Sequence, residues 1–370
     1  MIKICHLTSV HKRYDTRIFI KQCKSLANHN MDTHLVVADG LGDELKDKVK
    51  IIDVGFKQGR IRRILLTTIL VYKKALELDC EIYHLHDPEL LPIGLKLKKN
   101  GKKVIFDSHE DFSKQFLNKP YLNMPLRKII SFFLLKYEKY VCSKLDYILA
   151  ATSYIKIKFL KINKNSIDIN NFPIIDELFN DTLWEDKKNE VFYVGAIQKV
   201  RGIKEMVKSM EYTNNIELNL GGKFADDQNE LYREVKSFEG WGKVNELGYL
   251  NREDILKMLI RSKAGLVTLH PIINYVDALP VKMFEYMAAE IPVITSDIPL
   301  WKDIVESNEC GIAVNPMNPK EIADAISYII NNPNEASKMG KNGRLAVINK
   351  FNWSKEEEKL LTVYKKIISQ

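Results

Sequence analysis

The sequence predicts an α/β protein built from two parallel-sheet domains. Apolar strand-like runs alternate with amphipathic helix-like runs along the whole chain, which is typical of parallel sheets covered by helices on both faces. The alternation lapses around Pro173 and then restarts, so it forms two series of similar length. A chain of 370 residues is also long enough for two domains of ordinary size.

In the first series, the candidate strands are separated mostly by helical patterns, for example at 15–28 and 61–78. These strands are expected at 2–7, 33–38, 50–55, 81–86, 102–107 and 146–152. The second series begins after the seam, and its strands are expected at 191–195, 216–222, 242–248, 264–270, 291–297 and 310–314.

This pattern places an N-terminal domain at 1–172 and a C-terminal domain at 173–351. Open parallel sheets bind ligands at the carboxyl ends of their strands. We therefore expect the functional residues to lie just after the strands.

Composition excludes several classes of protein. The chain is 45% hydrophobic and 28% charged, as expected for a soluble globular protein. Its five cysteines are scattered, odd in number and free of a C-x-x-C pair, which favours a reducing cytoplasmic setting without disulfides or a zinc site. The short apolar run at the N-terminus is too short for a signal peptide, and charge interrupts every apolar stretch before a membrane span is reached.

The charge is unevenly distributed along the chain. Residues 1–175 hold 31 Lys and Arg against 18 Asp and Glu, whereas the remainder holds 25 against 30. A basic half predicts an anionic partner, either a phosphate-rich ligand, a nucleic acid or an acidic membrane surface. No nucleic-acid-binding motif is present, so we expect no nucleic acid. Segments 59–76 and 125–144 mix basic with aliphatic and aromatic residues, which fits either interfacial helices on anionic lipid or core helices with basic outer faces.

Two loops of the second series are candidate phosphate sites. In "FYVGAIQKVRGIKEM", a strand ends at Gly195, and Lys199 and Arg201 precede a helix. In "NLGGKF", Gly222 allows close backbone approach and Lys223 adds charge. A solvated basic loop and a tight turn are the respective alternatives.

The segment "VDALPVKMFEYMAAEIPVITSD" is more informative. Pro280 fits the first turn of a helix that continues through 281–289. Lys282 in that first turn opposes the helix dipole unless an anion neutralises it. Glu285 can accept hydrogen bonds from sugar hydroxyls, or pair with Lys282 three residues earlier. Asp277 is either a ligand contact or a structural residue, namely a helix cap or a residue of the turn before the helix.

The first series offers imidazoles after two strands. His109 in "VIFDSHEDF" fits a group that donates to developing negative charge, or a satisfied structural histidine. His84 and His86 share one strand face, which fits a metal less well than two histidines packed in a sheet, so we expect no metal. No D-x-D is present, so lysines, arginines and helix ends must neutralise any bound diphosphate.

The loop after the first strand, "SVHKRYDTRIFIK", contains no glycine and is no dinucleotide fingerprint. Its charged residues either contact an acidic acceptor or serve the next helix, with Asp15 as its cap; they are His11, Lys12, Arg13, Asp15 and Arg17.

Taken together, these motifs resemble retaining glycosyltransferase family 4. "DALPVKMFEYMAAEIPVITSD" resembles its E-x7-E region, and "VGAIQKVRG" resembles its donor-phosphate loop. "HDPELLP", "FDSHEDF" and "HKRYDTRIFIK" resemble its first-domain motifs, in the expected order. The resemblance implies the GT-B architecture, with two Rossmann-like domains facing across a cleft and a terminal helix, 352–370, packing back on the first domain.

The resemblance also implies roles for the site residues. The C-terminal domain would bind a nucleotide sugar, the N-terminal domain an acceptor, and transfer would retain configuration without a metal or cofactor. Glu285 would hold the ribose, Asp277 the donor sugar, Arg201 the phosphates, and His109 would lie near the reacting centre. Backbone N–H groups near Leu279 and Val281 would hold the diphosphate, and the loops that contain Gly195 and Gly222 would also belong to the donor site.

Two departures from the family pattern concern the donor site. Asp277 stands where glutamate is usual, and Ala196 stands where an arginine is usual. We expect Lys282 to supply the missing positive charge, with Lys199 and Lys223 as the other candidates.

The expected function is transfer of a hexose or N-acetylhexosamine from a nucleotide diphosphate sugar, with UDP favoured over GDP. The expected acceptor is a lipid-linked or other saccharide in surface polysaccharide biosynthesis. The basic half would bind the inner face of the cell membrane peripherally. The alternatives are a sugar-nucleotide 2-epimerase of the same fold and a non-catalytic nucleotide-sugar-binding subunit.

Overall fold

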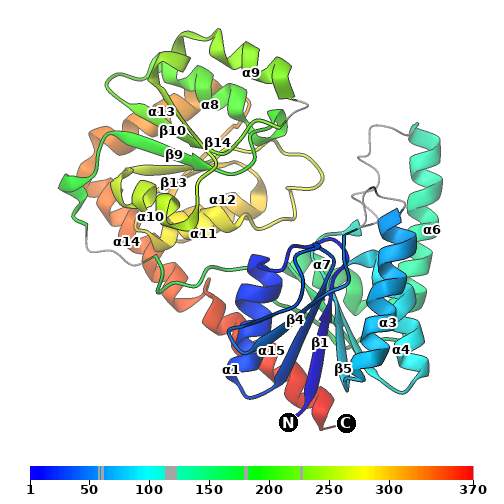
Figure 1. Cartoon of the computed structure of the whole chain (residues 1–370). Helices are drawn as coiled ribbons and strands as arrows, with labels where there is room; N and C mark the ends of the chain where they lie inside the picture. The colour runs from blue at the N-terminus through cyan, green and yellow to red at the C-terminus, as the bar shows by residue number, and fades with distance from the viewer. Residues whose placement is uncertain (57–58, 60–61, 113–122, 179–181, 226–227, 370) are drawn as a thin grey trace. The chain divides into compact units, whose positions relative to one another are not determined.

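The computed structural model describes residues 1–56, 59, 62–112, 123–178, 182–225 and 228–369. The chain divides into two compact units. Unit 1 consists of Met1–Asn171 with Ser354–Gln370, and unit 2 consists of Phe172–Trp353. Both are layered α/β structures with helices on two faces of a sheet (Figure 1).

The described part of unit 1 forms an eight-stranded sheet in the order β3-β4-β2-β1-β5-β6-β7-β8. Its strands are β1 (Lys3–Leu7), β2 (Asp32–Val37), β3 (Glu44–Lys46), β4 (Val49–Asp53), β5 (Ile82–Leu85), β6 (Lys103–Ser108), β7 (Tyr147–Ala150) and β8 (Ser166–Asp168). The expectation of purely parallel strands is wrong for β3, which pairs antiparallel with β4. Asp47 and Lys48 join the two strands with positive φ angles of 50° and 64°, as a two-residue hairpin turn requires.

The helices of unit 1 cover both faces of this sheet. They are η1 (Thr16–Cys23), α1 (Lys24–Asn28), η2 (Arg63–Thr67), α3 (Thr68–Leu78), η3 (Pro88–Leu90), α4 (Leu91–Lys99), α6 (Met124–Cys142), α7 (Ser153–Leu160) and most of α15 (Trp353–Ile368). The predicted helix 15–28 is present as η1 and α1, and the Asp15 carboxylate accepts from the N–H groups of Arg17 and Ile18 at 2.8 and 2.9 Å. Asp15 is therefore the helix cap. The predicted helix 61–78 begins outside the described residues and is seen from Arg63.

Alternation along the strands divides the core of unit 1 in two. Leu35 and Val37 of β2 pack with Ile18 and Phe19 of η1, whereas Val36 faces the other core. In Figure 1, α1 and α15 lie on one side of the sheet, and α3, α4 and α6 lie on the other.

The C-terminal helix α15 is anchored to unit 1 by polar contacts. The Glu356 carboxylate accepts from the backbone N–H of Asn170 at 2.8 Å. The Tyr364 hydroxyl lies 2.8 Å from Nδ1 of His84 on β5. Both side chains on α15 are buried, so the helix completes the core of unit 1.

The described part of unit 2 forms a six-stranded parallel sheet in the order β11-β10-β9-β12-β13-β14. Its strands are β9 (Glu190–Val194), β10 (Glu217–Gly221), β11 (Val244–Gly248), β12 (Ala264–Val267), β13 (Val293–Ser296) and β14 (Gly311–Val314). Its helices are η4 (Trp184–Asp186), η5 (Lys199–Arg201), α8 (Ile203–Ser209), η6 (Met210–Tyr212), α9 (Asn229–Lys236), η8 (Glu239–Lys243), α10 (Arg252–Arg261), α11 (Val281–Ala288), α12 (Pro299–Ser307), α13 (Pro319–Asn331) and α14 (Pro333–Asn349). One core packs against α10, α11, α12 and α14, and the other packs against α8, α9 and α13 (Figure 1).

Each sheet has a topological switch point, which is where open α/β sheets bind ligands. In unit 1 the chain runs outward on one side through β2 and on the other through β5, so the switch lies between β1 and β5. In unit 2 it lies between β9 and β12. The loops that follow these four strands carry most of the residues considered below.

Candidate functional site

Three glycines let the loops at the switch point of unit 2 approach one another closely. A Cβ on Gly222 would lie 2.0 Å from the carbonyl oxygen of Gly195, and one on Gly202 would lie 2.0 Å from that of Thr268. Their φ angles are 140°, 141° and 73° for Gly222, Gly195 and Gly202, in the region that favours glycine. The loops after β9, β10 and β12 therefore meet with no side chain between their backbones.

Lys282 reaches this meeting point from the first turn of α11. The residue is 9% exposed, and its Nζ lies 3.8 Å from the centroid of the Tyr193 ring. A Cβ on Gly195 would lie 2.9 Å from the same Nζ. Within the described parts of the chain, this buried nitrogen has no hydrogen-bond partner.

The electrostatics of Lys282 are unfavourable without a ligand. Burial, and next the nearby Arg201, lower the pKa of Lys282 well below its usual value. A buried, unpartnered amine beside a second cation is costly unless an anion accompanies it. The arrangement therefore fits an anion that lies between the two side chains.

Arg201 ends the short turn η5, directly before Gly202. Its guanidinium carbon lies 5.2 Å from the centroid of the Tyr275 ring, and its Nε is buried without a partner among the described residues. The backbone N–H of His270 donates to Val200 at 3.1 Å, which ties this turn to the loop after β12.

The start of α11 provides backbone donors. The first N–H groups of a helix have no partner within it, and here they belong to Val281 and Lys282. Trp301 Nε1 donates to the carbonyl of Ala278 at 2.6 Å and holds the preceding loop in place. Pro280 occupies the cap position, so Asp277 is not the cap of this helix.

Glu285 lies one turn further along α11, and its partner was not predicted. Its carboxylate pairs with the guanidinium of Arg252 on α10, which also bonds Glu177 at 3.2 Å. The alternative of a pair with Lys282 is therefore wrong. Lys199 and Lys223, the other candidates for the missing charge, are exposed surface residues.

In unit 1, His109 follows β6 and is held by buried groups. Its Nε2 lies 3.3 Å from Asp107 and 3.3 Å from Nδ1 of His86. Asp107 is fully buried and accepts two hydrogen bonds from Arg17 at 2.6 and 2.9 Å. Although burial opposes it, Arg17 and then the imidazoles hold the pKa of Asp107 well below its usual range. Asp107 is thus a buried carboxylate that can orient the His109 ring.

A third imidazole joins His84 and His86 from the neighbouring strand. His6 pairs in register with His84, and its Nδ1 lies 2.9 Å from Nε2 of His86. Burial lowers the pKa of His86 to about 3 and those of His6 and His84 well below normal, so the rings are neutral. Neutral rings can form a chain in which Tyr364 donates to His6, His6 to His86, and His86 toward Asp107.

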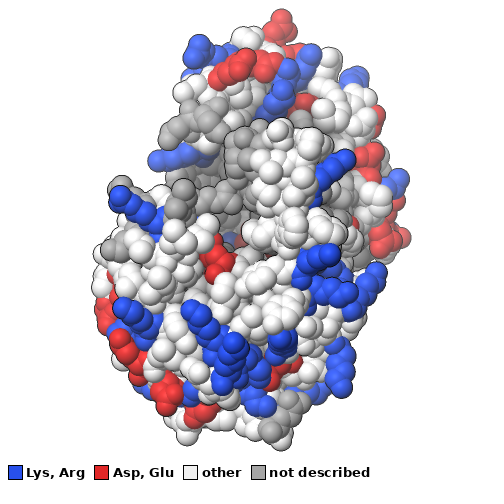
Figure 2. All heavy atoms as spheres, turned by 90° about the vertical axis from the view of Figure 1, so that its right-hand side faces the viewer, with Lys and Arg blue, Asp and Glu red and all other residues white. Residues whose placement is uncertain are grey.

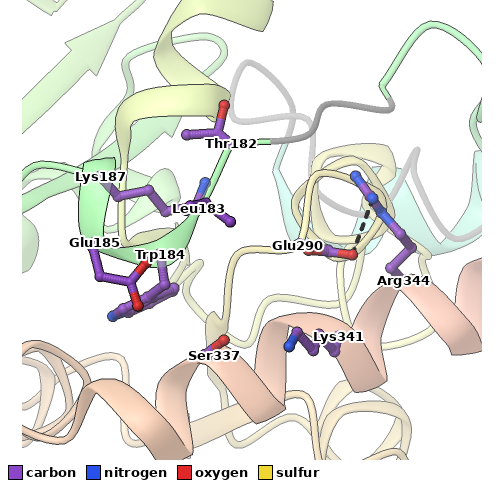
Figure 3. A pocket seen from close by; sticks show the side chains of 9 residues that line it. All are labelled: Thr182, Leu183, Trp184, Glu185, Lys187, Glu290, Ser337, Lys341 and Arg344. Carbon is purple, nitrogen blue, oxygen red and sulfur yellow. Dashed lines mark ion pairs between the residues drawn. The ribbon is translucent and has the colours of Figure 1, made fainter.

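A separate pocket lies at the other end of the unit 2 strands, away from their carboxyl ends. Figure 3 shows it between the Trp184 segment and α14, with Glu290 and Arg344 paired at 3.0 Å. Glu290 precedes β13, so the pocket is at the amino ends of the strands, away from Lys282. None of the predicted site residues lines it.

Residues 174–346 match the family model for glycosyl transferases group 1. The matched residues lie within unit 2, Phe172–Trp353.

The curated relatives of the chain are distant in sequence. The spore coat protein SA of Bacillus subtilis is 25% identical over 190 residues, which cover 48% of this chain and 49% of that protein. The capsular polysaccharide biosynthesis glycosyltransferase CapM of Staphylococcus aureus is 26% identical over 186 residues, covering 48% and 46%. The chain thus spans about half the length of the curated relatives it matches.

Solved structures show that the fold extends over the whole chain. A sucrose-phosphate synthase from Thermosynechococcus elongatus superimposes with a TM-score of 0.81 at 16% identity, covering 100% of both chains. Anabaena HepE, solved in complex with UDP-glucose, gives a TM-score of 0.76 at 13% identity, with 99% and 100% covered. These neighbours are glycosyltransferases of two Rossmann-like domains, and this chain has that GT-B fold.

Within unit 2, the structure brings Gly195, Gly222, Arg201 and Lys282 to one place. Sequence reasoning missed Tyr193, which packs under Lys282, and Arg252, which pairs with Glu285. Tyr193 lies on the continuously buried strand β9, two residues before Gly195, so its proximity was open to prediction. Nothing in the sequence around Arg252 indicated that it would pair with Glu285.

Proposed function

We propose that the protein is a retaining glycosyltransferase that uses a nucleotide diphosphate sugar as donor and no bound metal. The observation that carries the proposal is the buried, unpartnered Nζ of Lys282 at the start of α11, beside Gly195 and near Arg201. A diphosphate placed there would meet two cations and the free N–H groups of a helix start.

In this mechanism the charge of the leaving diphosphate is taken up by the protein. As the bond to the sugar breaks, Lys282, Arg201 and the start of α11 stabilise the developing negative charge. Asp277 would contact the donor sugar. Glu285 would accept hydrogen bonds from the ribose, either while it keeps its pair with Arg252 or after that pair breaks. We infer front-face attack, in which the departing phosphate helps to deprotonate the acceptor hydroxyl.

The proposed donor is a UDP-hexose or UDP-N-acetylhexosamine, since the solved neighbour HepE binds UDP-glucose. The proposed acceptor is a lipid-linked saccharide of a surface polysaccharide, in line with the named role of the relative CapM. Unit 1 would bind the acceptor beside His109.

A thermal-shift screen across UDP-, GDP-, ADP- and dTDP-sugars tests the donor. A ligand at 100 times its Kd stabilises the folded state by about 2.7 kcal/mol, so the right donor raises Tm measurably. Product analysis then separates the alternatives: transfer needs an acceptor, whereas a 2-epimerase converts the donor alone. No Tm change with any donor would refute the proposal.

We also propose that unit 1 binds an anionic membrane through α6 and η2. Contrary to the alternative of a core helix, α6 exposes large apolar side chains such as Ile129, Phe132 and Phe133, at 54%, 52% and 64%. Leu65 and Leu66 of η2 are also exposed. On the face that carries α3 and α6, Lys and Arg side chains gather beside uncharged surface (Figure 2). No helix in the described residues is long and apolar enough to cross a membrane.

Liposome flotation tests this contact. We expect flotation with vesicles that contain anionic lipid and much less with neutral vesicles. The double variant Lys128→Glu/Lys136→Glu on α6 should lose it, whereas Lys302→Glu/Lys320→Glu, an equal charge change on exposed residues of unit 2, should not. Equal flotation of both variants would show that net charge, not α6, is responsible.

A further inference from the structure

Two histidines stand side by side at the switch point of unit 1, each held by a buried aspartate. His11 follows β1, and its Nδ1 lies 3.1 Å from Asp87, which follows β5. The His109 ring, held by Asp107, lies 4.9 Å from the His11 ring, centroid to centroid. The two side chains are 27% and 21% exposed and line a cavity of about 490 Å³.

Four carboxylates line this cavity; Asp87, Glu89 and Asp107 are held by partners, whereas Glu110 is exposed. Asp87 accepts from the Thr8 hydroxyl at 2.8 Å and the Ser9 N–H at 2.7 Å, besides His11. The Glu89 carboxylate accepts hydrogen bonds from Nε and Nη2 of Arg63 at 2.9 and 3.2 Å. Although burial opposes it, His11 holds the pKa of Asp87 at about 2, so this carboxylate stays ionised.

Two other cations of the opening loop, Arg13 and Arg17, are not available for ligands, whereas Lys12 is exposed. Arg13 is buried in pairs with Asp39 and Glu44, and Arg17 is buried against Asp107. The expectation that Arg13 and Arg17 contact an acidic acceptor is therefore wrong. His11 is different, because its Nδ1 binds Asp87 and its Nε2 has no hydrogen-bond partner among the described residues, while the side chain lines the cavity.

His11 also favours its charged form. Burial would lower its pKa, but the hydrogen bond to Asp87 and the charges of Asp87, Asp15 and Asp107 raise it. These carboxylates come from the loops after β5, β1 and β6. The other charged or titratable groups that line the cavity with His11 are Arg63, His86, Glu89, His109 and Glu110. A protonated His11 presents an N–H donor with positive charge to the cavity.

We propose that His11 forms an oxyanion subsite in unit 1, where its Nε2–H binds a phosphate or carboxylate carried by the acceptor. The identity of the ligand as an acceptor rests on the proposed transferase function, whereas the oxyanion binding does not. His109 would then contact the neighbouring hydroxyl of the same acceptor, since the two rings are adjacent.

Nuclear magnetic resonance of the full chain with ¹³C-labelled histidine tests the subsite. The chain has eight histidines, so each ring signal can be assigned by substitution. Inorganic phosphate and acetate are titrated in separate arms at constant ionic strength. We expect one of the two anions to shift the His11 signal saturably and to raise the pKa of His11. The signal of exposed His29 should change no more than it does in a control titration with chloride. Saturation by phosphate or by acetate assigns the acceptor class.

Two variants keep the test decisive. An anion bound at His11 should also shift the signal of the adjacent His109 ring, and His11→Gln should abolish that shift. Asp87→Asn should lower the His11 pKa and weaken oxyanion binding with the ring intact. If neither anion shifts His11 more than His29, the subsite is refuted. If UDP competes with the anion, the anion occupies the donor site and the subsite is likewise refuted.

Activity separates this proposal from the proposed function. With an anionic acceptor, His11→Gln should raise KM for the acceptor at least tenfold and change kcat less than threefold; His29→Gln should change neither. A wild-type protein that binds phosphate at His11 but transfers no sugar would refute the transferase function and support the subsite.

Discussion

The Nζ of Lys282 lies 3.8 Å above the ring of Tyr193 and has no hydrogen-bond partner in the described residues. The π face compensates part of the cost of burying an ammonium group. The remainder is a penalty that the free protein bears and that a bound diphosphate would remove.

Lys282→Met should therefore stabilise the free protein and impair catalysis. Methionine fills similar space without a buried polar group, so the free energy of unfolding should rise by on the order of 1–3 kcal/mol. Loss of one contact to the leaving group should lower kcat by about 10²–10³. Urea unfolding and steady-state kinetics measure the two effects. Lys302→Met, on an exposed residue, is the control for both, and unchanged kcat in Lys282→Met would exclude the role of Lys282.

Binding of UDP should be accompanied by proton uptake. Because the pKa of Lys282 is depressed in the free protein, the amine is partly deprotonated well below its usual pKa, and a diphosphate raises that pKa again. Between the two pKa values, the complex holds more protons than the free protein. Calorimetry in buffers of different ionisation enthalpy should show this uptake, and Lys282→Met should abolish it. Proton release would contradict the model.

The same depression gives the stability of the free protein a definite pH dependence. An unfolded lysine titrates near pH 10.4, whereas the folded pKa of Lys282 lies well below that value. In this window the unfolded state binds more protons, so stability should fall as pH falls through it. The difference in unfolding free energy between wild type and Lys282→Met should shrink toward high pH. A difference that does not depend on pH would show that the amine is not desolvated.

The alternation of strands and helices was enough to predict the fold. In each half of the chain, apolar residues are spaced as in a strand and then as in a helix, and this sequence of patterns repeats. Local signals also located Asp15 as a cap and Pro280 at the start of α11. The hairpin of β3 was missed because three exposed or half-exposed residues give no apolar alternation. Pairs distant in sequence were not predictable: Arg17 with Asp107 and Glu285 with Arg252 form only when separate loops meet at a sheet edge.

Arg17→Met should strongly destabilise unit 1. It leaves the fully buried Asp107 without its main counter-charge, with Gln22 as a remaining donor at 2.8 Å. Removing one partner of a buried pair costs roughly 3–5 kcal/mol. Lys50→Met breaks an exposed pair with Asp32 and should cost less than about 1 kcal/mol. Urea unfolding compares them, and equal costs would show that Asp107 is solvated.

Tyr364→Phe should loosen α15 and the histidine chain together. The change removes a hydroxyl that lies 2.8 Å from Nδ1 of His84 and 3.3 Å from Nε2 of His6, and it leaves the His84 N–H buried without a partner. Such a loss costs about 1–3 kcal/mol. Hydrogen exchange should then quicken in α15 and β5, while unit 2 keeps its rates. Tyr328→Phe, on an exposed residue of α13, should leave both units unchanged. Because Tyr364 is the donor at the head of the chain that ends at Asp107, its loss should also alter the His6 and His86 ring signals. If the exchange rates change but these signals do not, the hydroxyl serves packing alone and the proposed proton order is incorrect.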